Sequence, residues 1–423
     1  MAGEFRGAVA RRSAALYAAN LVTLSLPLAS VPYLARVLGP VAWGELAIGQ
    51  AIATVLAVLI DYGHGQSGTR DLVRACASGD VRRFAATVLA SKLVLAIAAA
   101  TLVVTVAGFG LLPVRTDLVP AAIAAGVAIG SSPLWLVQAG DRIGRYLALD
   151  VTVKVAAVAA LFVLVDEPSD APRVLWLQAG AGTVSLAGGL FLSQIRPALG
   201  LPTPAAIARL LHEQRYGFLF RTTILTYTTA NVLVLGFLAR PQDVGLFAAA
   251  ERAVRVVANF AGPLGQALFP ILARSWREDP VAAARLARRA TVVVAGIGAL
   301  FGLCFLVGAE QIALFLLGSQ FAGAAPLLAI LAPLPLLIGV SNILGVQWMF
   351  SIRAEDALVR ILVVAGAACL PTGALLATIY GAPGMAVAAT VAETLVTAGI
   401  LAHLARSKSL PTAFALRRPG HAH

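Results

Sequence analysis

Long apolar segments separated by short polar ones follow one another along almost the whole chain. An α-helix needs about 20 apolar residues to cross a hydrocarbon core of roughly 30 Å, and most of these segments have about that length. The pattern therefore predicts an all-α integral membrane protein with about twelve transmembrane helices. The expected spans are 14–35, 42–61, 87–108, 118–138, 146–165, 173–193, 217–239, 244–270, 289–309, 326–349, 358–380 and 384–404.

Composition supports this prediction and excludes a soluble globular domain. The chain of 423 residues is 59% hydrophobic and 12% charged, and its mean hydropathy is +0.87. Soluble proteins have about 25% charged residues. A net charge of +12 would suggest nucleic-acid binding in a soluble protein. Here the basic residues lie between apolar segments, so we expect membrane lipids, and no nucleic acid, as their partners.

Lysine and arginine residues are concentrated in every second polar segment. The N-terminal tail, alternate loops and the C-terminal tail carry 23 of them, whereas the intervening loops carry Arg36, Arg115, Arg173 and Arg240. Cytoplasmic segments are the ones enriched in these residues. We therefore expect a multi-pass protein of the bacterial inner membrane with both termini in the cytoplasm. No cleavage site ends the first apolar segment, which we expect to remain as the first span.

Two short motifs of the first half recur in the second half at nearly the same separation. The matched residues are Pro40 and Gly44 with Pro241 and Gly245, and Ser132 and Gln138 with Ser341 and Gln347. Each half has six expected spans and begins on the same side of the membrane. This repeat predicts two six-helix lobes, related by a parallel pseudo-twofold axis along the membrane normal, with a cleft between them.

A longer polar segment connects the two halves. Within it Thr203 and Pro204 mark a helix start, and the apolar residues that follow share one face. This predicts a short helix on the cytoplasmic surface. The expected organisation is an N-terminal lobe at 1–193, a cytoplasmic linker helix at 194–216, a C-terminal lobe at 217–405 and a basic cytoplasmic tail at 406–423.

Four cationic residues inside the expected spans are candidates for substrate binding. A charge at the bilayer centre costs roughly 2.5–3.5 kcal/mol on insertion scales, so each one needs a reason. Arg252 and Arg255 are three residues apart in the eighth span, and Arg252 lies roughly 10 Å from its outer end. Together with Arg221 and Lys154 they could form a cationic cleft for a phosphate-bearing ligand. These four are the candidate substrate-binding residues.

The same cations also have structural interpretations. Asp150 and Glu251 each stand four positions before a cation of their own helix, Lys154 and Arg255, at the spacing of an internal ion pair. Arg221 lies close enough to a helix end to reach the membrane surface. Lys92, one turn into its helix, is expected to be an interfacial anchor of this kind.

Glu393 stands alone in the middle of the twelfth span. A carboxyl group at this depth is a candidate site for a coupling proton or sodium ion, and Asn231 offers a further oxygen. Interhelical hydrogen bonding is the alternative.

We expect neither catalysis nor a bound metal or cofactor, apart from the coupling ion. Cys76, Cys304 and Cys369 have no metal-ligand or disulfide spacing. The solvent-facing segments contain no catalytic constellation and no glycine-rich phosphate loop.

Several strings in both halves resemble the O-antigen and exopolysaccharide flippases, the polysaccharide branch of the multidrug/oligosaccharidyl-lipid/polysaccharide exporter superfamily. They are Leu26–Leu28, Pro32–Pro40, Trp43–Gly44, Asp61–Gly63 and Gly68–Arg70 in the first half, and Val244–Arg252, Gly262–Leu264 and Ala267–Pro270 in the second. The resemblance implies a V-shaped exporter fold that carries an undecaprenyl-pyrophosphate-linked oligosaccharide to the periplasmic leaflet. It also implies alternating access, ion-gradient coupling, a monomer, and basic residues such as Arg252 and Arg255 facing a central cavity.

Three other functions are weighed against this one. A multidrug or cation antiporter of the same superfamily should line its cavity with acids rather than arginines. A membrane-embedded glycan polymerase or ligase needs a large outer loop, and no outer loop exceeds about twenty residues. A symporter of the major facilitator type should carry a signature loop that residues 61–83 do not show.

Overall fold

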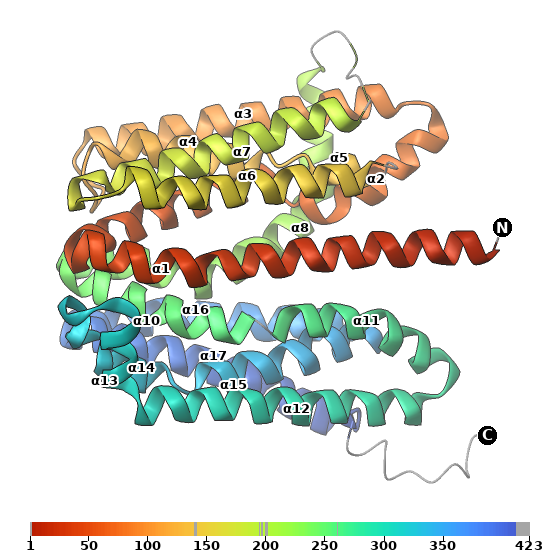
Figure 1. The fold of residues 1–423 in the computed structure, drawn as a ribbon. Coiled ribbons are helices and arrows are strands. Elements are labelled where there is room, and N and C mark those ends of the chain that lie inside the picture. Colours follow the sequence, from red (N-terminus) through yellow and green to blue (C-terminus); the bar gives the residue numbers. More distant parts are fainter. Residues whose placement is uncertain are drawn as a thin grey trace. The chain divides into compact units, whose positions relative to one another are not determined.

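The computed structural model describes residues 2–138, 142–193, 195, 198, 202–259 and 261–411, and all regular segments in these ranges are helical (Figure 1). The chain forms two compact units. The first comprises Met1–Leu225 with Arg240–Gly245, and the second Thr226–Ala239 with Leu246–His423. The chain therefore passes between the units three times, the last time inside helix α10 (Pro241–Asn259).

In the first unit, α3, α4, α6 and α7 run side by side (Figure 1). Its helices are α1 (Ala2–Asp61), α2 (His64–Ser78), α3 (Val81–Gly108), α4 (Leu118–Gly130), α5 (Leu134–Gln138), α6 (Ile143–Leu164), η1 (Pro168–Asp170), α7 (Ala171–Ser193) and α8 (Pro204–Thr228).

In the second unit, α17 packs against both α15 and α16. Besides most of α10, this unit contains α9 (Ala230–Leu238), α11 (Ala261–Glu278), α12 (Pro280–Val307), α13 (Ala309–Ile312), η2 (Ala313–Leu317), η3 (Ser319–Ala324), α14 (Ala325–Leu331), α15 (Leu334–Ser341), η4 (Asn342–Met349), α16 (Glu355–Tyr380) and α17 (Ala382–Arg406).

Within the described residues, eight helices are long and apolar enough to cross a membrane, or ten if two bent helix pairs count as one span each. One of the eight, Leu21–Asp61, has 41 residues, about twice what one crossing needs, and contains most of the first expected span and all of the second. The expected eighth span lies in α10 and α11. Helix α10 carries Glu251, Arg252 and Arg255, which lowers its mean hydropathy.

Gly39 divides α1 into two helices. Its φ of 67° and ψ of 174° are non-helical, and a residue with a Cβ rarely takes this conformation. Pro40 then begins the second helix, as its fixed φ and missing N–H allow at a first helical position. The first two expected spans are thus joined directly, without an intervening loop.

The two Pro-x-x-x-Gly motifs lie against each other within the first unit. A Cβ on Gly44 would overlap the carbonyl oxygen of Pro241, and a Cβ on Gly245 would overlap that of Pro40. The repeated motif therefore marks a place where two helix backbones approach closely, which only glycine permits.

The second repeated motif marks two departures from α-helical geometry. Ser132 lies in the interruption between α4 and α5. Its counterpart Ser341 ends α15, after which the π-helix η4 contains Gln347. In both halves the motif thus lies where the span deviates from a regular α-helix.

Helix α8 begins at Pro204 as predicted, and Thr203 Oγ1 accepts a hydrogen bond of 3.3 Å from the backbone N–H of Ala206. It does not end at residue 216. The expected surface helix and the first half of the seventh span form one helix, interrupted at Thr229. Residue 201 and most of 194–200, as well as 412–423 of the basic tail, lie outside the described residues.

Candidate functional site

Lys154 forms an ion pair within its own helix. Its Nζ lies 2.6 Å from Asp150 Oδ2 on α6, and Ser185 of α7 donates a hydrogen bond of 2.8 Å to the other oxygen of Asp150. The pair predicted from the four-residue spacing is confirmed. The carboxylate of Asp150 also connects α6 to α7.

Arg255 joins two carboxylates in the second unit. Its Nε lies 3.0 Å from Glu251 Oε1 in the same helix, which confirms the predicted pair. Its Nη1 lies 3.7 Å from Glu393 Oε1 on α17. The expected isolation of Glu393 is therefore wrong, because α17 brings this buried carboxyl group to a cation that is distant in sequence.

Asn231 belongs to the same neighbourhood. It is buried on α9, and its Oδ1 lies 3.8 Å from Cys369 Sγ on α16. Cys369 is within electrostatic range of Glu393, Glu251 and Arg255. Both candidate ion-coupling residues thus lie around one cluster of two carboxylates and one guanidinium.

Arg252 precedes this cluster on α10. Its side chain is partly buried, and its guanidinium is within electrostatic range of Glu251. Arg252 and Arg255 belong to the second unit, whereas Lys154 and Arg221 belong to the first.

Lys92 is not an interfacial anchor. Its side chain is only 3% exposed, and its Nζ lies 3.1 Å from Asp61 Oδ1. The ammonium also donates to the carbonyl oxygens of Gly130, at 2.9 Å, and Ser132, at 3.5 Å. Those carbonyls lie at and just beyond the C-terminal end of α4, where a cation is favoured. Lys92 therefore connects α1, α3 and α4.

His64 lies beside this ion pair at the start of α2. It is fully buried, and its Nε2 lies 3.4 Å from Ser91 Oγ, which itself donates to the carbonyl oxygen of Val88. Burial, and secondly the charge of Lys92, lower the pKa of His64 to about 4. The imidazole is therefore neutral at physiological pH.

Arg221 lies on α8, within electrostatic range of Lys92. In the described part of the chain, no carboxylate oxygen lies within ion-pair distance of its guanidinium. Asp61 is already engaged, since its second oxygen accepts a hydrogen bond of 3.2 Å from the backbone N–H of Gly65. Arg221 thus differs from Lys154 and Arg255, whose charges are balanced by carboxylates.

Sequence reasoning missed the Asp61–Lys92–His64 cluster. The available signal was the string Asp61–Gly63, which carries a carboxylate at the end of an apolar span. Its partner Lys92 lies on another helix, so no short spacing connects the two.

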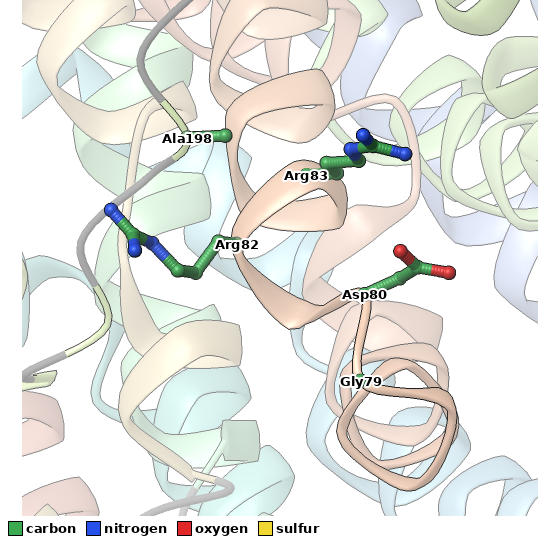
Figure 2. A pocket seen from close by; sticks show the side chains of 5 residues that line it. All are labelled: Gly79, Asp80, Arg82, Arg83 and Ala198. Carbon is green, nitrogen blue, oxygen red and sulfur yellow. The ribbon is translucent and has the colours of Figure 1, made fainter.

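A cavity of about 490 Å³ opens elsewhere in the first unit, at the start of α3. Gly79, Asp80, Arg82, Arg83 and Ala198 line it, and Figure 2 shows the side chains of Arg82 and Arg83 pointing to opposite sides. The two guanidinium groups therefore do not converge on one anion, and none of the four candidate cations lines this cavity.

Comparison with known proteins places the chain among membrane transporters. The model of a family described as "Polysaccharide biosynthesis protein" matches residues 9–276. A protein of Escherichia coli (strain K12) designated as an O-antigen transporter is 27% identical over 395 residues, which cover 91% of this chain and 94% of the relative. A protein of Haloferax volcanii designated as a low-salt glycan biosynthesis flippase is 23% identical over 348 residues, or 80% of this chain and 71% of the relative.

Solved structures show the same fold. The lipid II flippase MurJ in an inward closed conformation aligns with a TM-score of 0.72 at 11% identity, covering 95% of this chain and 90% of that one. An inward-facing multidrug resistance MATE family transporter of the MOP superfamily aligns with a TM-score of 0.69 at 15% identity, covering 92% and 96%. The predicted all-α exporter fold is confirmed, and so is the expectation of a transporter rather than an enzyme.

Proposed function

Because this chain belongs to the polysaccharide biosynthesis protein family, we propose that it is a flippase for lipid-linked glycans. It carries an undecaprenyl-pyrophosphate-linked oligosaccharide from the cytoplasmic to the periplasmic leaflet by alternating access. The protein works as a monomer in the bacterial inner membrane, with both termini in the cytoplasm.

The main support for an anionic head group is that Arg221 has no carboxylate partner among the described residues. A guanidinium inside an expected membrane span is expensive unless an anion compensates it, and no carboxylate of the described chain lies within ion-pair distance of Arg221. A pyrophosphate supplies several acceptor oxygens and suits the planar, bidentate donors of arginine.

The buried carboxylates already have cationic partners, which disfavours a drug or cation antiporter. Such a cavity needs carboxylates that are available to a cationic ligand. Glu251 and Glu393 instead share Arg255, and Asp150 is occupied by Lys154 and Ser185. Each of these three carboxylates therefore already has a cationic side chain within 4 Å.

The Glu251–Arg255–Glu393 cluster is the proposed ion-coupling site. Two ionised carboxylates and one guanidinium carry a net charge of −1, which one proton or one sodium ion neutralises. Asn231 contributes a further oxygen nearby.

Reconstitution into proteoliposomes tests the function. The purified protein should move an undecaprenyl-pyrophosphate-linked oligosaccharide between leaflets, as measured by its accessibility to a membrane-impermeant glycosidase. Arg221→Ala should lower the rate about tenfold or more, since an arginine–phosphate contact is lost. Arg274→Ala, at an exposed ion pair with Glu278, is the matched control and should transport normally. No movement of the lipid by wild-type protein would refute the proposal.

A further inference from the structure

One face of α8 docks on the turn between α1 and α2. Gln214, Gly217, Phe218 and Arg221 are spaced at i, i+3, i+4 and i+7 and therefore share this face. At the N-terminal end of this face, Gln214 Nε2 donates a hydrogen bond of 2.8 Å to Asp71 Oδ2 on α2. At the C-terminal end of this face, Arg221 lies within electrostatic range of Lys92 on α3.

The centre of this contact is a stacked ring pair. The rings of Tyr62 and Phe218 have centroids 4.3 Å apart and planes inclined by 7°. Tyr62 has a φ of 46°, in the left-handed region that a residue with a large side chain rarely adopts. Tertiary contacts must hold this conformation, and the stack on α8 is one of them.

Gly63 brings the two backbones together beside the rings. Its φ is +86°, and a Cβ at this position would lie 2.9 Å from both Gly217 C and Phe218 N. Two independent constraints, the left-handed backbone and the close approach, therefore require glycine here.

The Asp61–Lys92 ion pair fixes the turn from the other side. Lys92 ties Asp61 to the end of α4, and the backbone N–H of Gly65 occupies the second carboxylate oxygen. The pair also has an electrostatic effect: because Asp61 is neutralised by Lys92, it is not available as a counter-ion for Arg221.

We infer that the Asp61–Gly63 turn, locked by Lys92, is a seat that positions Arg221 for the diphosphate of the lipid-linked substrate. Asp61, Gly63 and Lys92 are thus positioning residues that act through α8, whereas Arg221 touches the ligand. The inference rests on the proposed function, because it takes the head group of that substrate as the ligand of Arg221.

A double-mutant cycle on the purified full-length protein tests this seat. The measurement is the affinity for undecaprenyl diphosphate in nanodiscs, for wild type, Gly63→Ala, Arg221→Ala and the double variant. Each single substitution should weaken binding about tenfold, the scale of one charge-assisted contact. The double variant should bind no more weakly than Arg221→Ala alone, because Gly63 acts only through Arg221.

Gly217→Ala is the matched control. A Cβ there would lie 3.5 Å from Gly63 Cα, an ordinary contact, so binding should stay within twofold of wild type. If Gly63→Ala does not fold, Phe218→Leu replaces it in the same cycle, because this change removes the ring stack and keeps an apolar side chain.

The outcomes separate the two proposals. Additive losses in the cycle, or unchanged binding by Gly63→Ala or its replacement, would overturn the seat. Normal binding by Arg221→Ala together with weakened binding by Arg252→Ala would also overturn the seat while leaving the flippase function standing. Failure of the wild-type protein to bind undecaprenyl diphosphate would overturn both.

Discussion

Gly44 and Gly245 occupy equivalent positions in the two halves of the repeat, and each lies against the backbone of the other's helix start. A methyl group on either one would overlap a proline carbonyl oxygen, that of Pro241 or of Pro40. The contact lies in the first unit, immediately before α10 passes into the second. Two helices that meet through backbone atoms cannot accommodate extra volume without moving apart.

Alanine at either glycine should therefore destabilise the protein. We expect Gly44→Ala and Gly245→Ala each to cost about 1–3 kcal/mol, the usual effect of overpacking, and to lower the unfolding temperature in detergent. Gly180→Ala on α7 is the control, because a Cβ there has no neighbour within 4 Å and alanine favours the helix. Equal unfolding temperatures for Gly245→Ala and Gly180→Ala would contradict the contact.

The coupling cluster predicts a specific loss in Glu393→Gln. The amide keeps the shape of the side chain next to Arg255 but cannot bind a proton. Transport by this variant in proteoliposomes should no longer respond to an imposed proton or sodium gradient, whereas Glu278→Gln, at an exposed site on α11, should respond like wild type. An unchanged gradient response in Glu393→Gln would remove Glu393 from the coupling site.

The ion pair of Lys154 with Asp150 favours a structural role for this lysine. Lys154→Met and Asp150→Asn should each lower stability and transport, because each leaves a charge unbalanced within the membrane. The double variant, which lacks both charges, should regain stability and transport. A double variant that recovers stability but not transport would instead assign Lys154 to the substrate, and a thermal melt alongside the flipping assay distinguishes the two results.

Buried His64 makes stability depend on pH. Its folded-state pKa is about 4, below the ordinary value of 6.5, because burial and the Lys92 charge oppose protonation; Asp61 and Asp71 act in the opposite sense. Between these two values the unfolded chain binds more protons, so the free energy of unfolding should fall by about 3 kcal/mol as the pH drops from 7 to 4.

His64→Gln should flatten this part of the pH profile of unfolding, whereas His212→Gln, at an exposed site on α8, should keep the wild-type profile. A wild-type profile in His64→Gln would contradict the assignment of the pH dependence to the buried imidazole.

What the sequence could predict depended on how far apart the interacting residues lie in the chain. The Asp150–Lys154 and Glu251–Arg255 pairs were predictable because helical geometry alone brings residues four positions apart together. The contact of Arg255 with Glu393 joins α10 to α17 and depends on helix packing, which periodicity does not specify.

The same limit explains the error at Lys92. Its depth in the helix indicated an anchor at the membrane surface, yet the direction of its side chain is set by Asp61 and the end of α4. Gly217 was likewise taken to open a new span, whereas α8 passes through it without interruption. The close approach there depends on Gly63 instead, because a Cβ on Gly63 would lie 2.9 Å from Gly217 C, whereas one on Gly217 would make only ordinary contacts.

The bond between Lys92 and Asp61 also bears on how the protein enters the membrane. The two residues are separated by 31 positions, so during synthesis the second span leaves the translocon with an uncompensated acid and the third with an uncompensated base. Each charge alone opposes partition into lipid, with an upper limit of about 2.5–3.5 kcal/mol, which is the cost at the centre of a span. The two spans should therefore be released together, as a pair. Lys92 finds the carbonyl oxygens of Gly130 and Ser132 only after α4 has been made, so we expect the first four spans to insert together.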